Sequence, residues 1–240
     1  MVDRAGGRPP ESLAMPRHAV MQRSRTADVA TWIGLLGFGI IFGLVKARRS
    51  DALDVALMIR FQAVRHATLA RLMTLVSWPG FPPQSRIIPP IITAVLFLLR
   101  LRVEAAMQLL AWGTGGLSTI LKSLMRRPRP VAGTDLRVIA APLGGSSFPS
   151  GHVITYVGTY GWLAYVLHTI VRPTWPRRLV VGGLGAFVAF VGPSRIYQGH
   201  HWPTDVAASY FLGLTYVISL ASIYRRLKAK SPSVASRLGR

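Results

Sequence analysis

The sequence predicts an all-α fold: a polytopic membrane helical bundle of about six transmembrane helices, plus an amphipathic interfacial helix. Half of the 240 residues are hydrophobic and the mean hydropathy is +0.37. These residues are gathered in long blocks between polar loops, and about 20 apolar residues are enough for a helix to cross a bilayer. A soluble protein with buried helices is the alternative, and the lengths of the blocks disfavour it.

Six apolar blocks define the predicted spans, at residues 29–45, 87–99, 105–121, 153–171, 179–191 and 206–224. The second and fifth blocks are short and need flanking residues to cross a bilayer. The first 27 residues are polar and lack the apolar core of a signal peptide. We therefore expect one membrane domain (28–226) between a disordered basic cytoplasmic tail (1–27) and a second basic cytoplasmic tail (227–240).

The segment from Asp51 to Trp78 has a different pattern. Apolar residues recur near helical spacing, while Asp54, Gln62 and Arg65 interrupt them. This pattern is typical of an amphipathic helix that lies on the membrane surface or packs against the bundle. The prolines that follow it, Pro79, Pro82 and Pro83, are expected to end it.

The charges of the loops predict an orientation with both termini in the cytoplasm. The loops on that side are rich in basic residues, namely Arg100, Arg102, Arg172, Arg177, Arg178, Arg225, Arg226, Lys228 and Lys230. This agrees with the tendency of cytoplasmic loops to collect lysine and arginine. Lys46, Arg48 and Arg49 fall on the outer side and argue against it.

The composition also limits the chemistry. The formal net charge of +21 suits nucleic acid, anionic lipid or a phosphorylated substrate, and nucleic acid is the weakest of these because the basic residues alternate with apolar blocks. The absence of cysteine excludes disulfides, thiolate zinc sites and cysteine nucleophiles. With only eight acidic residues, the chain is poorly equipped for a two-metal site. A mechanism without a metal or other cofactor is therefore expected.

The first polar cluster runs from Lys122 to Pro130 and contains Arg126, Arg127 and Arg129. Lys122 ends an apolar block, whereas Arg129 lies between two prolines that favour an extended backbone. Fixed cations of this kind suit a phosphate, because arginine offers a planar fork of donors and lysine a point charge. The alternative is a set of interfacial cations with no ligand.

The second cluster is Ser146-Ser147-Phe148-Pro149-Ser150-Gly151-His152, directly before the fourth apolar block. Such a turn into a helix presents backbone N–H groups to an anion. Ser150 adds a hydroxyl, Gly151 permits close approach, and His152 is placed to exchange a proton. The alternative is that Ser150 only caps the helix and that His152 is an interfacial histidine.

The third cluster contains Ser194-Arg195, His200-His201 and Asp205. His201 and Asp205 are four residues apart, so the carboxylate is expected to hydrogen-bond one imidazole nitrogen and leave the other as a nucleophile. Arg195 supplies another phosphate ligand. A zinc site made by His200, His201 and Asp205 is the competing hypothesis.

Taken in order, these clusters resemble the three signature motifs of the type 2 phosphatidic acid phosphatase superfamily, the membrane lipid phosphate phosphatases. The resemblance covers a motif-bearing core at residues 105–224. It implies that His201 attacks phosphorus, that Asp205 orients it, and that His152 protonates the leaving group and then activates water. The phosphate ligands that it implies are Lys122, Arg129, Ser150, Gly151 and Arg195, with no metal.

We therefore expect a multi-pass cell-membrane enzyme with its active site at the extracytoplasmic face. It hydrolyses a phosphate or pyrophosphate monoester of a lipid, through a phosphohistidine. Candidate substrates are polyprenyl diphosphate, which is slightly favoured, phosphatidic acid, phosphatidylglycerol phosphate and a phosphorylated glycolipid. The rival functions are a lipid phosphotransferase with the same site, a non-enzymatic lipid-binding or transport protein, and a vanadium haloperoxidase. The sequence does not indicate an oligomeric state.

Overall fold

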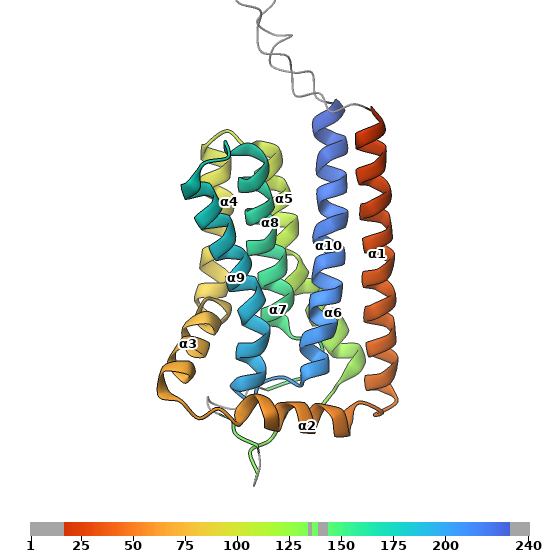
Figure 1. The fold of residues 1–240 in the computed structure, drawn as a ribbon, viewed down its shortest axis with the longest axis vertical. Coiled ribbons are helices and arrows are strands. Elements are labelled where there is room, and N and C mark those ends of the chain that lie inside the picture. The colour runs from red at the N-terminus through yellow and green to blue at the C-terminus, as the bar shows by residue number, and fades with distance from the viewer. Residues whose placement is uncertain (1–16, 134–135, 139–143, 231–240) are drawn as a thin grey trace, which may run out of the picture.

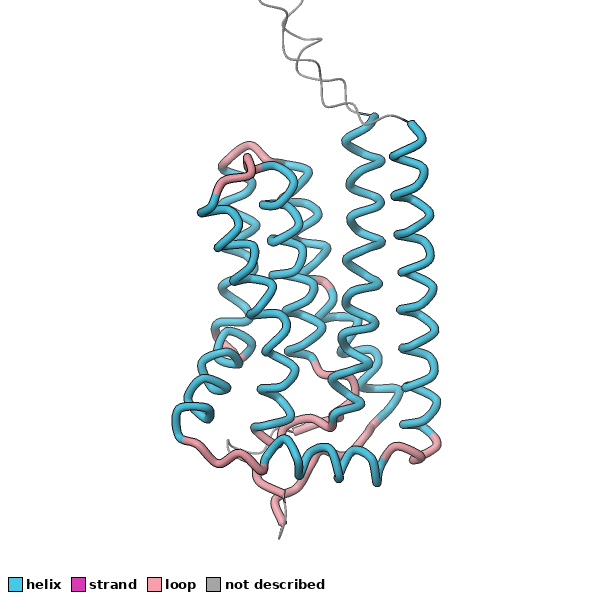
Figure 2. Tube along the Cα trace, viewed as in Figure 1, coloured by secondary structure: helices cyan, strands magenta, loops and turns pink. Residues whose placement is uncertain are grey.

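The computed structural model describes residues 17–133, 136–138 and 144–230, and every regular element within these residues is helical (Figures 1 and 2). The prediction of an all-α fold is therefore confirmed. The helices are α1 (Arg17–Lys46), α2 (Asp51–Gln62), α3 (Ala67–Ser77), α4 (Gln84–Leu98), α5 (Arg102–Trp112), α6 (Thr114–Met125), α7 (Gly151–Tyr156), α8 (Trp162–Ile170), α9 (Trp175–Tyr197) and α10 (Pro203–Lys230). A 3₁₀ turn, η1, covers Trp78–Gly80, and a π turn, η2, covers Val157–Gly161.

Three helical segments are each long and apolar enough to span a membrane: Arg25–Lys46, Trp175–Tyr197 and Pro203–Lys228. The other three apolar blocks form helices that are shorter or interrupted. α4 has 15 residues, the third block is divided between α5 and α6 at Gly113, and the fourth is divided by η2. These elements run side by side with the long helices in Figure 1. The number of six spans stays a prediction.

The surface of the bundle is apolar in the way that a lipid environment requires. α1 packs along α10, yet its outer side chains remain uncovered. Trp32 is 71% exposed and Leu36 is 65% exposed. A contiguous apolar face of this size is unusual for a soluble monomer and suits contact with lipid.

The segment 51–78 forms two helices rather than the single amphipathic helix predicted. α2 lies across one end of the bundle, and α3 runs up its side against α9 (Figure 1). His66 has an extended backbone, and its Nδ1 accepts a hydrogen bond from the Thr68 N–H. This N-cap begins α3 and explains the break, because it satisfies a donor that the first turn of a helix leaves unpaired.

Part of each predicted tail is helical. Residues 17–27 form the first turns of α1, and 227–230 extend α10, because both stretches consist mainly of good helix formers that continue a helix already begun. Pro16 precedes α1 and Pro232 follows α10, where proline is compatible with helix ends. Residues 1–16 and 231–240 lie outside the described part of the chain.

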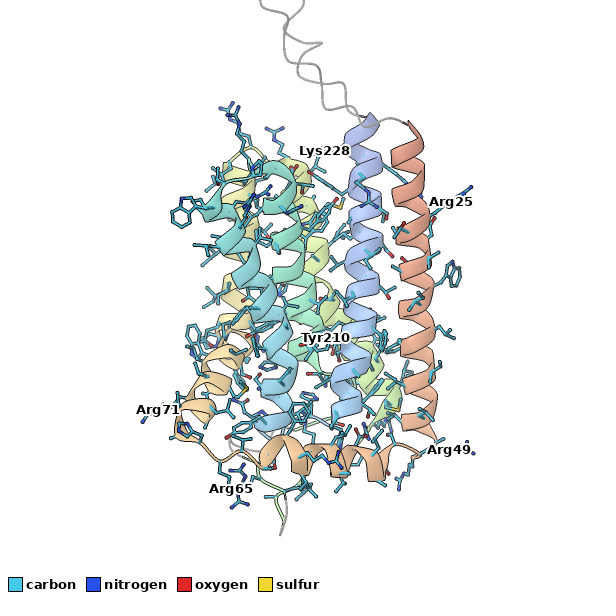
Figure 3. The ribbon with its side chains drawn as sticks, in the orientation of Figure 1. Arg25, Arg49, Arg65, Arg71, Tyr210 and Lys228 are labelled. Atoms are coloured by element: carbon cyan, nitrogen blue, oxygen red, sulfur yellow. The ribbon has the colours of Figure 1, made fainter. Side chains whose placement is uncertain are left out.

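The two ends of the bundle differ in their content. α1 begins and α10 ends at one of them, where Figure 3 labels Arg25 and Lys228. The opposite end carries α2 and most of the loops (Figure 2), and Figure 3 labels Arg49, Arg65 and Arg71 there. The three motif clusters lie together at this second end, as expected if they form one active site.

Candidate active site

The ends of four helices bring the predicted site residues together. Lys122 lies in the last turn of α6, Ser150 to His152 begin α7, Arg195 is in the last turn of α9, and Asp205 is in the first turn of α10. Arg129 and His201 lie in the intervening loops, where a 3.3 Å contact joins them. The site therefore draws on segments that are far apart in the sequence.

His201 is almost completely buried and is held through its Nδ1 atom. Nδ1 lies 2.7 Å from the carbonyl oxygen of Ser147, and because a carbonyl only accepts, Nδ1 carries the proton and Nε2 carries the lone pair. Arg129 Nη1 lies 3.3 Å from that Nε2. The nitrogen with nucleophilic character therefore faces a cation, which is where a phosphoryl oxygen would bind.

The hydrogen bond expected between His201 and Asp205 is not made. Asp205 Oδ2 lies 3.7 Å from His201 Nδ1, which is beyond hydrogen-bonding distance. Oδ2 instead accepts the Trp202 N–H at 2.9 Å, and Oδ1 accepts from Arg127 at 2.7 Å. Ser147 orients the imidazole directly, while Asp205 supplies a negative charge beside it.

Asp205 is joined to α2 through a buried ion network. Arg127 bridges Asp205 Oδ1 at 2.7 Å and Asp54 Oδ2 at 2.6 Å. Asp54 also accepts the Thr204 N–H at 2.9 Å and the Thr204 hydroxyl at 2.7 Å. Asp54 and Asp205 are fully buried, so these contacts provide the pairing that buried charges need. The network fixes α2 against the start of α10.

Lys122 and Arg129 share a backbone acceptor. Lys122 Nζ donates to the Ser146 carbonyl at 2.8 Å, and Arg129 Nη2 donates to it at 3.2 Å. Arg129 also donates to the carbonyls of Gly144 and His200. These bonds hold two like charges in place beside the site, as the binding of an anion requires.

Arg195 is completely buried, and three neighbours fix its guanidinium. Nη1 donates to Gln198 Oε1 at 2.8 Å, and Nη2 lies 2.5 Å from His200 Nδ1. The Phe81 ring stacks against it, with the guanidinium carbon 4.9 Å from the ring centroid. His200 therefore faces an arginine and not His201, and its contact helps to hold the guanidinium of Arg195 in place.

His152 is packed against the loop that follows α3. The Phe81 ring lies edge-on to the imidazole, with the centroids 4.6 Å apart. A Cβ on Gly80 would lie 2.2 Å from His152 Cδ2, so only glycine leaves room for the imidazole there. His152 Nε2 is buried without a hydrogen-bond partner within the described residues. This atom is therefore available to a bound substrate.

The start of α7 and the end of α9 each provide a further unpaired group within the described structure. Ser150 Oγ and Arg195 Nε are buried and make no hydrogen bond there. Buried polar atoms of this kind normally have partners, so a phosphate is a natural ligand for them. The backbone N–H of Ser150 is not available, because it donates to Ser209 Oγ at 2.7 Å.

The electrostatic environment keeps His201 neutral. Burial lowers the pKa of His201 well below its usual value, and the positive charges of Arg195, Lys122 and Arg129 lower it further. A neutral imidazole retains the lone pair that a nucleophile needs.

The geometry disfavours the zinc hypothesis. His200 Nδ1 and His201 Nε2 each face a guanidinium, which would repel a metal cation at the same place. Within residues 17–133, 136–138 and 144–230, no group of three His, Asp or Glu side chains is placed to hold a metal ion.

Three contributors were not identified from the sequence: Asp54, Ser147 as the acceptor for His201, and the Gly80-Phe81 pair. Asp54 carried a signal, because an acidic residue is costly in an apolar helical pattern unless it has a partner. The others act through backbone or ring contacts that leave no distinctive spacing.

The bundle and its cation-lined site define a class: a membrane protein that handles phosphorylated ligands. A sequence model of the PAP2 superfamily matches residues 103–229, more than half of the chain. The chain therefore belongs to the PAP2 superfamily of membrane lipid phosphatases, and the resemblance of its motifs is confirmed.

Individual relatives agree with this assignment. Phosphatidylglycerophosphatase B of Bacillus subtilis (strain 168) is 28% identical over 200 residues, which cover 80% of this chain and 94% of that protein. The crystal structure of a transmembrane PAP2-type phosphatidylglycerolphosphate phosphatase from Bacillus subtilis matches with a TM-score of 0.73 at 26% identity, over 84% of this chain and 98% of that one. Aquifex aeolicus LpxE shares the fold, with a TM-score of 0.55 at 23% identity over 72% and 95% of the two chains.

Proposed function

We propose that this protein hydrolyses the terminal phosphate monoester of a membrane lipid through a phosphohistidine at His201. The observation that carries the proposal is the arrangement of this imidazole: Nδ1 bonds to the Ser147 carbonyl, and Nε2 faces Arg129. The two relatives from Bacillus subtilis are named for phosphatidylglycerophosphate. That lipid therefore replaces polyprenyl diphosphate as the first substrate to test.

The reaction proceeds in two displacements. His201 Nε2 attacks phosphorus, the bond to the lipid oxygen breaks, and His152 gives that oxygen a proton. His152 then takes a proton from water, whose oxygen attacks the phosphohistidine and releases inorganic phosphate. Lys122, Arg129 and Arg195 stabilise the equatorial oxygens, the largest contribution in reactions of this type. No metal ion takes part in this scheme.

A cavity of about 400 Å³ supports access for a lipid. It contains Lys122, Gly151 and His152 at one end and extends between α4, the α5–α6 junction and η2. Its other lining residues include Pro89, Trp112 and Tyr160. A cationic end next to walls that contain apolar and hydroxyl-bearing side chains fits a phosphorylated headgroup whose chains remain in the bilayer.

A second cavity of about 370 Å³ reaches the opposite side of the site, where Arg129 and His200 line it. Its remaining lining residues are in loops at the end of the bundle opposite the start of α1, namely Pro128, Pro130, Val131, Ala132, Val138, Gly145 and Gly199. We assign it to the entry of water and the exit of phosphate. On the proposed six-span topology, with cytoplasmic termini, this end faces the extracytoplasmic side.

The leaving group distinguishes acid catalysis from simple phosphate binding. A lipid alkoxide is a poor leaving group that needs a proton, whereas p-nitrophenolate departs without one. We expect His152→Ala to lose about 10²–10⁴-fold in kcat/KM on phosphatidylglycerophosphate and much less on p-nitrophenyl phosphate. Arg195→Ala, which removes a phosphate ligand, should impair both substrates similarly.

The assay measures phosphate release by purified protein in detergent, with each substrate below saturation. His201→Ala is the inactive reference, and His168→Ala, an exposed histidine on α8, is the matched control. Equal losses for His152→Ala on both substrates would make His152 a binding residue. Activity of His201→Ala comparable with wild type would refute the proposed nucleophile.

A further inference from the structure

A cavity of about 450 Å³ lies outside the proposed active site, at the same end of the bundle. It is formed where the α1–α2 turn meets the end of α6 and the loop before α10. Its lining residues are Val45, Lys46, Arg48, Asp51, Asp54, Val55, Met125, Arg126, Arg127, Pro128 and Trp202. None of the proposed phosphate ligands or catalytic residues is among them, so this is a separate cavity.

The charges around this cavity favour an anion. Lys46, Arg48 and Arg126 are exposed cations at its rim. The buried carboxylate of Asp54 is already paired with Arg127 and with Thr204, so it opposes an anion only weakly. With Arg127 included, four cations and two carboxylates line the cavity, and the balance is positive.

The cavity is also amphiphilic. Val45 and Met125 are buried apolar residues in its wall, and Trp202 lines it from the loop before α10. Tryptophan is enriched at the level of lipid headgroups. Lys46 is the last residue of a candidate span, which places the cavity where a spanning helix leaves the hydrocarbon region.

The position of the rim cations is not explained by topology. On the proposed orientation they lie on the outer face, where the positive-inside tendency does not favour lysine or arginine. Nor are they part of the phosphate site. Their grouping around one cavity therefore calls for a ligand there.

We propose that this cavity binds the phosphate of an anionic phospholipid of the surrounding bilayer, in addition to the substrate at the proposed active site. The rim cations contact the phosphate, and the apolar wall contacts the first carbons of the acyl chains. Arg127 forms part of the wall and also holds Asp205, so the bound lipid stabilises the end of the bundle that carries the site. The inference does not depend on the proposed reaction.

The test counts bound lipids on the full-length protein by native mass spectrometry, after exchange into micelles with phosphatidylglycerol or phosphatidylcholine. The test variant is Lys46→Ala/Arg48→Ala/Arg126→Ala. The control variant, Arg49→Ala/Arg65→Ala/Arg71→Ala, removes the same charge from exposed arginines that lie at the same end but outside the cavity (Figure 3). Neither variant alters a residue of the proposed active site.

We expect the wild-type protein to retain one more lipid molecule from phosphatidylglycerol micelles than from phosphatidylcholine micelles. The test variant should bind that lipid at least about tenfold more weakly, because each cation near an anionic lipid contributes severalfold to affinity, while the control variant binds as wild type does. Equal losses in both variants, or equal retention of the two lipids by wild type, would overturn the proposal.

Two further arms complete the experiment. Release of the lipid by millimolar inorganic phosphate would show that the cavity prefers a soluble anion, and it would overturn the proposal that the bound phosphate belongs to a phospholipid. If the alanine variant does not fold, Lys46→Arg/Arg48→Lys/Arg126→Lys preserves the charges and should retain the lipid. Loss of the lipid from this folded variant would also contradict the proposal.

Discussion

Replacing Asp54 by asparagine tests the buried network behind the proposed active site. Asp54 is one of three carboxylates that contact Arg127, and the side chains of Asp54 and Arg127 are 0% and 7% exposed. Removing one partner of a buried ion pair costs roughly 3–5 kcal/mol. In the Asp54→Asn variant, Arg127 still has its ion pair with Asp205, and the asparagine oxygen can still accept the hydrogen bond from the Thr204 N–H. We therefore expect the lower end, about 3 kcal/mol, or a fall of roughly 6 °C or more in Tm.

Asp51→Asn is the matched control, because Asp51 lies on the same helix and contacts the same guanidinium. Its distance to Arg127 is 3.5 Å, however, and its side chain is 56% exposed. An exposed pair of this kind contributes at most about 1 kcal/mol. Thermal unfolding in one detergent, followed by circular dichroism, should separate the two variants. Equal shifts in Tm, or no measurable shift for Asp54→Asn, would refute the assignment of Arg127 and Asp54 as a stabilising pair.

Three further predictions follow from the geometry of the site. His201→Ala should abolish the acid-labile phosphoenzyme in a quench experiment, whereas His200→Ala should still form it but with a raised KM, because Arg195 loses a partner; the reverse pattern would show that the wrong histidine was chosen. Because the pKa of His201 is lowered, its imidazole stays neutral at pH values below the usual histidine pKa of about 6.5, and kcat/KM should be retained at those pH values. Arg129→Ala removes a positive charge that lowers this pKa, so the acidic limb of the pH profile of kcat/KM should move to higher pH. An unchanged acidic limb would contradict the electrostatic cause. Activity should survive chelation and be inhibited by vanadate, an analogue of the pentacoordinate transition state; activity that a chelator removes and one divalent ion restores would refute the metal-free scheme.

The sequence was sufficient to predict the helical class and the grouping of the motif clusters, for identifiable physical reasons. Apolar blocks have few options other than helices in a bilayer, because each backbone polar group must be satisfied within its own segment. The grouping followed from counting spans, since loops two spans apart return to the same face. Lys122, His152 and Asp205 could therefore be assigned to one end of the bundle before any contact was known.

Side-chain contacts between segments far apart in the chain could not be predicted from apolar blocks and span counts. Arg127 appeared to be one more cation of the first cluster, yet its partner Asp54 lies 73 residues earlier in the chain. Spacing within a helix predicts neighbours at three or four residues but carries no information on such pairs. The four-residue spacing of His201 and Asp205 shows the same limit: it brought them within 3.7 Å, but local bonds to Trp202 and Ser147 took the preferred geometry.

The interrupted helices follow from packing that only the folded chain shows. The break at Gly113 lies beside the π turn, where a Cβ on Gly158 would be 2.3 Å from the Ala111 carbonyl oxygen and 2.5 Å from Thr114 Oγ1. The backbone of Gly158 therefore already touches both sides of the break at Gly113, and an unbroken third helix would have to fit into the same small space. The sequence pattern alone favoured continuous spans, because the glycines fall inside apolar runs.

The organisation of the site also explains why its cations require so many backbone acceptors. Lys122 and Arg129 converge on one carbonyl, that of Ser146, although two like charges so close repel each other. Burial lowers the pKa of Arg129, which is the cost of holding a guanidinium away from water. A bound phosphoryl group relieves both the repulsion and the cost of burial, because it neutralises the cations and accepts hydrogen bonds from the donors that lack partners. The energy of folding is thus used to keep the donors in place before the substrate arrives, and this preorganisation is what lets fixed charges stabilise a transition state.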